Sequence, residues 1–395
     1  MNINHRNIFL NNVAQTSPAP LGLEIVKAEG IYMTDVNGKK YTDLISGISV
    51  SNLGHCHPKV VAAINEQAKT YMHLMVYGEY IQHPQTQYAK LLTSLLPTSL
   101  NCVYFTNSGT EATEGALKLA KRVTGRSEII CFKNSYHGST HGALSVMGNE
   151  EYKTSFRPLL PDVKQLEFNH FSQLDQITNK TACVIIEPIQ GEAGIHKANT
   201  QYLIELRKRC DETCTLLIFD EIQSGFGRTG LLFAFEHYNV TPDVLLIAKG
   251  MGGGLPIGAF VASEKLMSCL TNNPVLGHVS TFGGNAVCVA AAKATLEVLI
   301  EEKLYLRADE IEKIIVEMLV HPKIKEVRVA GALCAVEFGD VALNMDIINA
   351  CIKEGVIVDW FLHCATAMRI APPLIITNKE LRAALQIILN VINAA

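Results

Sequence analysis

Residues 244–256 have the sequence VLLIAKGMGGGLP. The first five residues are apolar without alternation, which predicts a strand buried on both faces of a sheet. Lys249 follows this run directly, and four glycines come within the next five residues. Burial lowers the pKa of a lysine and frees its amine as a nucleophile, as in enzymes that form a Schiff base. Glycines let the backbone pass close to a bulky group on that amine; the alternative is an ordinary surface lysine on a glycine turn.

The bulk composition narrows the class of protein. Hydrophobic residues make up 48% and charged residues 18% of the 395 residues, which is typical of a globular enzyme with a large core. The net charge of −4 gives no excess of basic residues, so the composition argues against nucleic-acid binding. No apolar stretch is long enough to span a membrane. The 11 cysteines are scattered and the first residues lack the apolar core of a signal peptide, so we predict a cytoplasmic protein with reduced thiols.

From about residue 85 onward, short apolar runs alternate with helical stretches, which indicates an α/β domain with a mainly parallel sheet. Polar residues follow these runs, and ligands of such sheets bind beyond the carboxyl ends of the strands. The runs lie at residues 103–105, 129–132, 183–186, 216–219 and 244–247. The polar residues that follow them are Thr106-Asn107-Ser108, Tyr136-His137, Glu187, Asp220 and Lys249. We therefore expect five runs to deliver chemistry to one edge of the sheet.

The chain divides into a predicted N-terminal arm and hairpin segment, a large domain and a C-terminal small domain, at residues 1–50, 51–290 and 291–395. Residues 1–20 are polar and predict an extended arm, and Asn37-Gly38 predicts a hairpin turn. A nearly continuous helix is expected over residues 285–319 as a bridge out of the large domain.

A second motif, FTNSGTE, lies at residues 105–111, where a strand runs into a helix. Ser108 and Glu111 fit an S-x-x-E capping box. Small residues such as Gly109 and Thr110 at a helix N-terminus leave backbone N–H groups free, and these groups can bind a phosphate. Alone, the motif is a commonplace helix cap.

Asp220 follows a buried apolar run, one strand–helix–strand unit before Lys249. A carboxylate in this place needs a cationic or hydrogen-bonding partner. An anion that keeps a pyridine nitrogen protonated, beside a lysine that forms an imine, is what an electron-sink cofactor requires. The alternative is an ordinary Asp–Lys ion pair.

Residues 225–230, GFGRTG, match the dinucleotide fingerprint G-x-G-x-x-G literally. No strand runs directly into the match, and the ribose-binding acid expected about 20 residues further on is missing. A nucleotide-binding or purely structural protein is therefore a secondary hypothesis.

Together these motifs resemble the class III pyridoxal-phosphate aminotransferases of fold-type I, the group of acetylornithine, ornithine, 4-aminobutyrate and putrescine aminotransferases. The resemblance covers nearly the whole chain, in the segments 105–114, 186–194, 219–230, 249–259, 280–285 and 369–373. It implies a large domain with a mostly parallel central sheet. It also implies a smaller α+β domain formed by the C-terminal part and the N-terminal segment.

The resemblance implies pyridoxal 5'-phosphate as the cofactor and no metal. Lys249 would form the Schiff base with the cofactor and later move the proton of the reaction. Asp220 would pair with the pyridinium nitrogen, Gln223 would approach the ring hydroxyl, and Tyr136 would stack on the ring.

The phosphate end of the cofactor would lie on Ser108, Gly109 and Thr110, with backbone N–H groups of the last two holding the phosphate. Thr281 would reach the phosphate of the other subunit, which implies a homodimer with active sites at the subunit interface. Arg369 would bind a substrate carboxylate, and Glu192 would pair with it when that carboxylate is absent. Such a switch lets one pocket take an ω-amine and then 2-oxoglutarate.

The chain departs from the family at two substrate positions. Members that act on ornithine, acetylornithine and aminobutyrate carry Arg after the aromatic-His-Gly triplet, where this chain has Ser139, and Ser cannot make a bidentate ionic contact. Ornithine-type members have Tyr where this chain has Ile48. His141 or Lys153 is left open as a substitute partner for the carboxylate.

The resemblance thus implies an ω-aminotransferase that moves a terminal amino group from an acetylornithine- or ornithine-like donor to 2-oxoglutarate by a ping-pong mechanism. Diamines such as putrescine, or 4-aminobutyrate, are the alternative donors. A pyridoxal-phosphate aminomutase or decarboxylase of the same fold is the alternative reaction.

Overall fold

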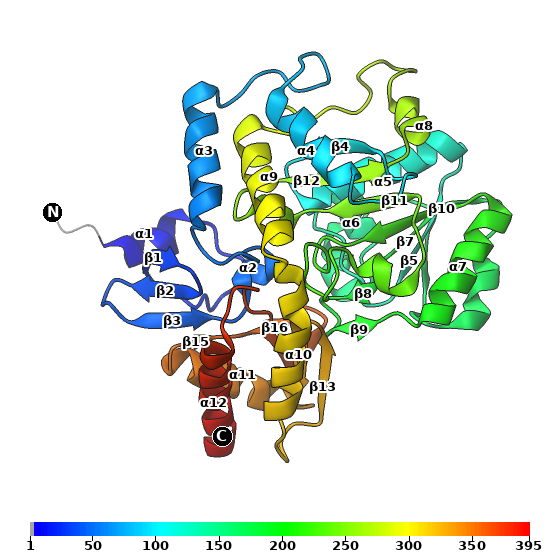
Figure 1. Cartoon of the computed structure of the whole chain (residues 1–395). Coiled ribbons are helices and arrows are strands. Elements are labelled where there is room, and N and C mark those ends of the chain that lie inside the picture. The colour runs from blue at the N-terminus through cyan, green and yellow to red at the C-terminus, as the bar shows by residue number, and fades with distance from the viewer. Residues whose placement is uncertain (1–3) are drawn as a thin grey trace.

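A computed structural model describes residues 4–395 of the chain, and its centre is a seven-stranded sheet (Figure 1). The strand order is β4-β12-β11-β10-β7-β5-β6. Their bounds are Cys102–Thr106 (β4), Glu128–Phe132 (β5), Val163–Leu166 (β6), Thr181–Ile186 (β7), Leu216–Asp220 (β10), Val244–Ile247 (β11) and Gly258–Ala262 (β12). All five predicted runs are strands, and the prediction of a mainly parallel sheet is confirmed.

Strand β12 runs antiparallel to both of its neighbours, β11 and β4. The chain reverses directly after Lys249, in a turn where Gly253 has a φ of 59° and Gly254 a φ of 110°. Such φ values are open to glycine at little cost. The glycine-rich run therefore returns the chain beside β11, so that the end of β11 lies between strands on both sides.

Helices cover both faces of this sheet, and the inner strand β11 is buried at every residue. On one face α5 packs against β11 and β12, and Leu119 and Leu246 belong to the same buried cluster. The helices up to residue 301 are α1 (His5–Asn12), α2 (Ser46–Ser49), α3 (Pro58–Thr70), α4 (His83–Thr93), α5 (Gly109–Thr124), α6 (His141–Ser145), α7 (Thr200–Thr213), α8 (Glu264–Met267) and α9 (Ala286–Glu301).

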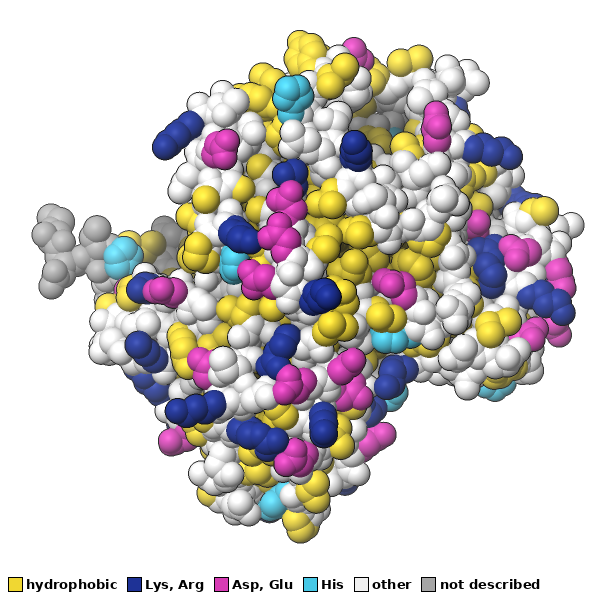
Figure 2. Space-filling model, viewed as in Figure 1, with side chains coloured by type: hydrophobic (Ala, Val, Ile, Leu, Met, Phe, Trp, Pro, Cys, Tyr) yellow, Lys and Arg dark blue, Asp and Glu magenta, His cyan; other side chains and the backbone are white. Residues whose placement is uncertain are grey.

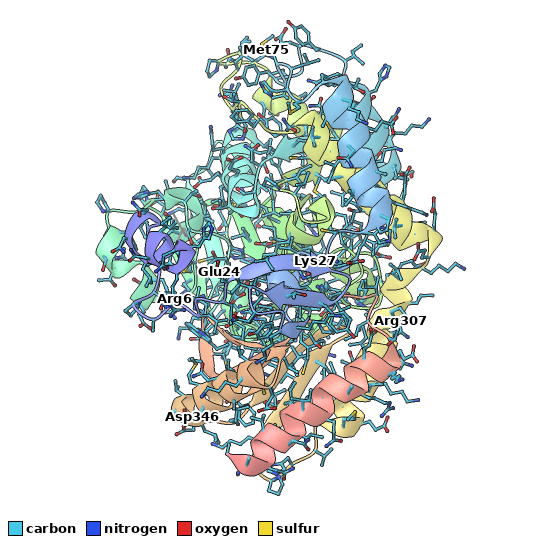
Figure 3. All side chains as sticks on the ribbon, turned by 90° about the vertical axis from the view of Figure 1, so that its left-hand side faces the viewer. Arg6, Glu24, Lys27, Met75, Arg307 and Asp346 are labelled. Atoms are coloured by element: carbon cyan, nitrogen blue, oxygen red, sulfur yellow. The ribbon has the colours of Figure 1, made fainter. Side chains whose placement is uncertain are left out.

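The predicted helix over residues 285–319 is wrong as a single element, because the structure breaks it into α9 and α10 (Arg307–Met318). Lys303 adopts the left-handed conformation with a φ of 50°, and the following 3-10 turn buries Leu304. Arg307, labelled in Figure 3, then donates hydrogen bonds to the carbonyl of Ile376 and to the side chain of Asn378, which begins α12 (Asn378–Ala394). The break thus brings α10 beside the last helix.

The C-terminal part holds an antiparallel sheet of order β13-β14-β17-β16, packed with α10, α12 and α11 (Val341–Lys353). Its strands are β13 (Glu326–Ala330), β14 (Leu333–Glu337), β16 (Asp359–Phe361) and β17 (Cys364–Ile370). A further sheet joins β1 (Ile25–Glu29), β2 (Tyr32–Asp35) and β3 (Lys40–Asp43) to β15 (Val356–Ile357), which runs parallel to β3. The N-terminal segment and the C-terminal part therefore share a sheet, as the predicted fold class requires. The divisions at residues 50 and 290 stay a prediction.

The N-terminal segment differs from the extended arm predicted over residues 1–20, because residues 5–12 form the helix α1. The side chain of Asn4 caps this helix by accepting a hydrogen bond from the backbone N–H of Asn7, and none of its residues is buried. Residues 1–3 of the predicted arm lie outside the described residues. The predicted turn at Asn37-Gly38 does connect β2 to β3, with a φ of 82° at Gly38. Within residues 4–395, no helix has the length and apolar character that crossing a membrane requires.

Replacing a side chain of β11 tests the role of this strand in stability. We expect Leu246→Ala to lower the free energy of unfolding by about 2–5 kcal/mol, because the cavity left in a packed core adds to the lost burial. The measurement is urea unfolding followed by circular dichroism. Val320→Ala, at a side chain that is 77% exposed, is the control and should change the unfolding midpoint little. Equal midpoints for both variants would contradict the central place of β11.

Candidate active site

A cavity of about 520 Å³ lies at the carboxyl ends of β7, β10 and β11 and at the loop after β5, the edge that the sequence predicted. Nine predicted site residues line it: Ser108, Gly109, Thr110, Tyr136, Ser139, Glu192, Asp220, Gln223 and Lys249. Its other lining residues include His137, Glu187 and Val50. Residues that are far apart in the sequence thus meet at one place.

Lys249 begins a 3-10 turn directly after β11 and has a φ of 46°, a conformation that non-glycine residues adopt rarely. The residue is half-buried because it faces the cavity. The protein packed around its amine lowers the pKa of Lys249; Glu192 and Asp220 act in the opposite direction, and Arg369 reinforces the lowering. A lowered pKa increases the fraction of neutral amine at neutral pH, and the neutral amine is the form that attacks a carbonyl carbon.

Asp220 ends β10 with its carboxylate fixed in place. Its Oδ2 lies 2.7 Å from Nδ1 of His137, and both side chains are buried. Its Oδ1 accepts a hydrogen bond of 3.0 Å from the backbone N–H of Ile222. Sequence reasoning gave His137 no role, although it follows a predicted strand within the aromatic-His-Gly triplet. The pair keeps a negative charge oriented at the inner end of the cavity.

The start of α5 forms a cradle at the other end of the cavity. Ser108 caps the helix by accepting a hydrogen bond of 3.3 Å from the N–H of Glu111. The capping-box prediction is half right, because the Glu111 carboxylate accepts from the N–H of Asn107 instead of returning to Ser108. The first N–H groups of a helix have no partner within it and favour an anion.

Two glycines keep this cradle open. A Cβ on Gly109 would lie 2.8 Å from the side chain of Ile222, and a Cβ on Gly138 would lie 2.5 Å from Cβ of Thr110. Gly138 also has a φ of 125°, and Thr110 is held by a hydrogen bond of 2.7 Å to the hydroxyl of Thr140. The space and the N–H groups fit a phosphate, and the oriented carboxylate and the lysine fit the ring end of pyridoxal phosphate.

Glu192 and Arg369 form the predicted ion pair, with 2.6 Å between Oε2 and Nη2, and both residues are buried. Burial alone would raise the pKa of Glu192, but the guanidinium of Arg369 and the amine of Lys249 outweigh it and lower that pKa. Glu192 also accepts hydrogen bonds of 3.2 Å from Gln223 and from the backbone N–H of Leu362. Nε and Nη1 of Arg369 are buried without a hydrogen-bond partner among residues 4–395. These two nitrogens are therefore ready to receive a carboxylate.

Tyr136 and Ser139 lie at the outer part of the cavity, where their hydroxyls are 3.2 Å apart. Ser139 is exposed. Neither alternative carboxylate partner lines the cavity: His141 is exposed at the start of α6, and the amine of Lys153 is held by Glu150 and by the carbonyl of Met147, each at 3.1 Å.

Ile48, Thr281 and Arg369 are the predicted residues that do not line the cavity, and of these Arg369 is connected to it by the ion pair with Glu192. Ile48 lies in the left-handed turn α2 with a φ of 65°, and it is Val50, two residues further on, that lines the cavity. Thr281 is exposed and accepts a hydrogen bond of 3.4 Å from the hydroxyl of Tyr77.

Glu187 is a further cavity residue to which the sequence analysis gave no role. Its two carboxylate oxygens accept hydrogen bonds of 2.9 Å from the N–H groups of Tyr136 and Gly191. Burial raises the pKa of Glu187 to about 7, against the influence of His137. Glu187 thus links the loop of Tyr136 to the loop of Glu192, and only its position directly after a buried run signalled it. Residues 4–395 hold no cluster of three or more side chains that could bind a metal.

Comparison with known proteins agrees with this geometry. Residues 13–392 match the aminotransferase class-III family. The acetylornithine aminotransferase of Methanocaldococcus jannaschii is 40% identical over 92% of this chain and 92% of its own, and that of Methanopyrus kandleri is 39% identical over 91% and 92%. The ornithine aminotransferase of Toxoplasma gondii superposes with a TM-score of 0.91 at 31% identity, covering 98% of this chain and 93% of its own. A transaminase of the marine bacterium Virgibacillus also has a TM-score of 0.91, at 26% identity and 98% coverage of both chains.

A lysine after an inner strand, an oriented carboxylate and a phosphate cradle define a pyridoxal-phosphate enzyme of fold-type I. The chain belongs to the class III aminotransferases, and it is therefore an enzyme that catalyses transamination with pyridoxal phosphate.

The cradle can be tested with Gly138→Ala. We expect the affinity for pyridoxal phosphate to fall about tenfold or more, because Ala is strained at a positive φ and its Cβ would press on Thr110. The measurement is titration of the apoenzyme with the cofactor, followed by fluorescence. Gly125→Ala is the control: its φ of 68° is also positive, but the space around it is open and it lies at the far end of α5. An equal loss of cofactor affinity in both variants would contradict the assignment.

Proposed function

We propose that the enzyme is an ω-aminotransferase that moves a terminal amino group from an acetylornithine- or ornithine-like donor to 2-oxoglutarate by a ping-pong mechanism. The observation that carries the proposal is the ion pair between Glu192 and Arg369 beside Lys249. A ping-pong enzyme must bind two different substrates in one cavity. In the closed state Glu192 and Arg369 are paired and their charges cancel, whereas in the open state they are apart and Arg369 presents its positive charge.

Bound pyridoxal phosphate supplies an electron sink for the charge that develops on the substrate carbon when its proton leaves. Lys249 would move that proton, because a lowered pKa allows its Nζ to accept a proton and return it near neutral pH. Asp220, fixed by His137, would hold a proton on the ring nitrogen of the cofactor. Tyr136 would cover the ring, and the backbone N–H groups of Gly109 and Thr110 would hold the phosphate.

The switch follows from the charges. While a terminal amine reacts, its carbon carries no carboxylate, and Glu192 neutralises Arg369. When 2-oxoglutarate binds, the Glu192 side chain moves away from Arg369, and Arg369 binds the substrate carboxylate next to the reacting carbon. Arg favours such a contact because its planar guanidinium can bind a carboxylate bidentately.

The relatives named acetylornithine aminotransferase support the donor class, and one observation favours a second candidate. Lys249 is the only lysine or arginine among the described residues that line the cavity, whereas Glu187, Glu192 and Asp220 all carry carboxyl groups. An acidic cavity with Ser139 at its outer part favours a diamine such as putrescine over a donor with a distal carboxylate. 4-Aminobutyrate is a further alternative donor. Formation of one glutamate per donor consumed distinguishes transamination from an aminomutase or decarboxylase reaction.

We further propose a homodimer in which Thr281 reaches the phosphate site of the partner subunit. Large apolar side chains are exposed within six residues of Thr281 or of its hydrogen-bond donor Tyr77, namely Met72 (66%), Ile81 (88%), Val275 (70%) and Phe282 (56%). Figure 2 shows hydrophobic side chains at the top of the molecule, where Figure 1 places the α3–α4 connection and the loop after α8. Exposed apolar groups of this kind mark an interaction surface.

We also propose that the enzyme works in the cytoplasm, because its eleven cysteines are unpaired within the described chain and several are buried. The substrates would then be the small metabolites of that compartment.

The Lys249→Ala variant tests the reaction itself. We expect it to lose turnover and the visible absorption of the covalently held cofactor, because no other lysine among the described residues lines the cavity. Absorption spectra and glutamate formation provide the measurement. Lys153→Ala, at a lysine held away from the cavity, should keep the visible band. A Lys249→Ala protein that stayed yellow and active would refute the proposal.

A donor panel of acetylornithine, ornithine, 4-aminobutyrate and putrescine tests the role of Ser139. We expect the wild type to discriminate weakly between them, and Ser139→Arg to raise kcat/KM for acetylornithine relative to putrescine about tenfold or more, because a charged hydrogen bond is gained. Ser139→Ala, which adds no charge, should leave the ratio unchanged. A wild-type preference of several orders of magnitude for ornithine or acetylornithine would show that Ser139 does not control selection.

A further inference from the structure

When the Glu192 side chain moves away from Arg369, its carboxylate needs another hydrogen-bond donor. The Glu192 side chain is buried, and a buried carboxylate without a hydrogen-bonding partner is costly. In the closed state Glu192 has Arg369, Gln223 and the N–H of Leu362 as partners. An open state in the same pocket therefore needs a replacement donor close by.

The turn between β16 and β17 carries such a donor. The backbone N–H of His363 donates a hydrogen bond of 3.0 Å to the carbonyl of Glu192, so the turn is attached to the switch residue. Nδ1 of His363 lies 3.3 Å from the amide nitrogen of Asn149. Because that amide nitrogen is a donor, Nδ1 accepts and Nε2 carries the hydrogen. Nε2 is buried and has no hydrogen-bond partner within residues 4–395.

The backbone carbonyls of Ser135 and Leu362 lie near this imidazole and raise its pKa, but neither forms a hydrogen bond with Nε2. The ring of Tyr152 stands edge-on at 5.3 Å between ring centres, and the ring of Tyr136 lies at 6.4 Å. The hydroxyl of Tyr152 is engaged with the carbonyl of Leu362 at 2.9 Å. Glu192 and, more weakly, Glu151 are the carboxylates whose charge acts on His363.

We propose that His363 is the second partner of Glu192: its Nε2–H donates to the Glu192 carboxylate when the carboxylate of the acceptor takes Arg369. This inference rests on the proposed switch and names a positioning residue that acts through Glu192. With His363 in place, Glu192 exchanges one buried partner for another, and the open state is stabilised without water entering the pocket.

The exchange has a consequence for protons. Burial lowers the pKa of His363 in the closed state, and Glu192 and Glu151 act in the opposite direction. Direct contact with the Glu192 carboxylate strengthens that opposing effect and raises the pKa of His363. The added proton enters at Nδ1, so the amide of Asn149 must turn its oxygen toward the ring and give up the hydrogen bond from the N–H of Glu151. With that turn, opening takes up a proton from solvent at a pH between the two values, and carboxylate binding tightens as the pH falls through that range.

The experiment uses the holoenzyme and glutarate, a dicarboxylate that has neither an amino nor a keto group and cannot react. For His363→Phe, which keeps a flat ring but has no donor, we expect the Kd of glutarate to rise about tenfold because a hydrogen bond to a charged group is lost. His363→Gln keeps an N–H donor, so it should restore most of the affinity but lose the pH dependence. Calorimetry in buffers of different ionisation enthalpy measures proton uptake, which should be present in the wild type and lost in both variants.

Two controls make the outcome decisive. The amino-donor half-reaction, in which Glu192 stays on Arg369, should keep its rate in His363→Phe, which also reports a folded protein with its cofactor in place. His170→Phe replaces an exposed histidine that is far from His363 in the sequence, and this variant should bind glutarate like the wild type. Wild-type glutarate affinity and proton uptake in His363→Phe would overturn the inference. If Arg369→Gln also bound glutarate normally, the proposed acceptor site would fail as well; if only Arg369→Gln lost binding, the proposed function would stand and His363 would have no part in it.

Discussion

The arrangement of this enzyme depends on the desolvated amine of Lys249, which follows the inner strand β11 and is influenced by the charges of three carboxyl groups. Protein packed around the amine lowers its pKa, while Glu192, Asp220 and Glu187 act against this. The result is a lowered pKa, and so a larger fraction of neutral amine than a surface lysine would have. The sheet supports this balance, because β11 lies between β10 and β12 and cannot move toward solvent.

The carboxyl groups around Lys249 differ in their own environments, and this difference separates their roles. Asp220 is bound to His137 and Glu192 to Arg369, so both have a cationic or hydrogen-bonding partner. Glu187 has only backbone N–H groups at its two oxygens, and burial raises its pKa to about 7. In the proposed function one carboxylate would serve the cofactor and one substrate exchange, whereas the third holds two loops together.

Much of this could be predicted from the sequence, because the signals were local or belonged to a family pattern. Five strands appeared as short apolar runs, and the residues directly after them form most of the cavity. Strands β6 and β12 went unrecognised because β6 has only two apolar residues in VKQL and β12 is a short GAFVA segment, so neither shows a clear strand pattern. The break at Lys303 depends on a left-handed conformation that no glycine or proline announced. His137 and Glu187 follow apolar runs, but their partners, like the partner of His363, lie on segments far away in the chain, and the local sequence does not identify such partners.

The parallel pairing of β15 with β3 has a consequence for how the chain matures on the ribosome. One edge of β3 (residues 40–43) pairs with residues 356–357, which are synthesised much later. The hairpin of β2 and β3 therefore keeps that edge unpaired through most of translation. Contacts between such distant segments slow folding, since a long loop must close before they form. A nascent or truncated chain that lacks its last strands would therefore present an open strand edge to other chains, which favours aggregation.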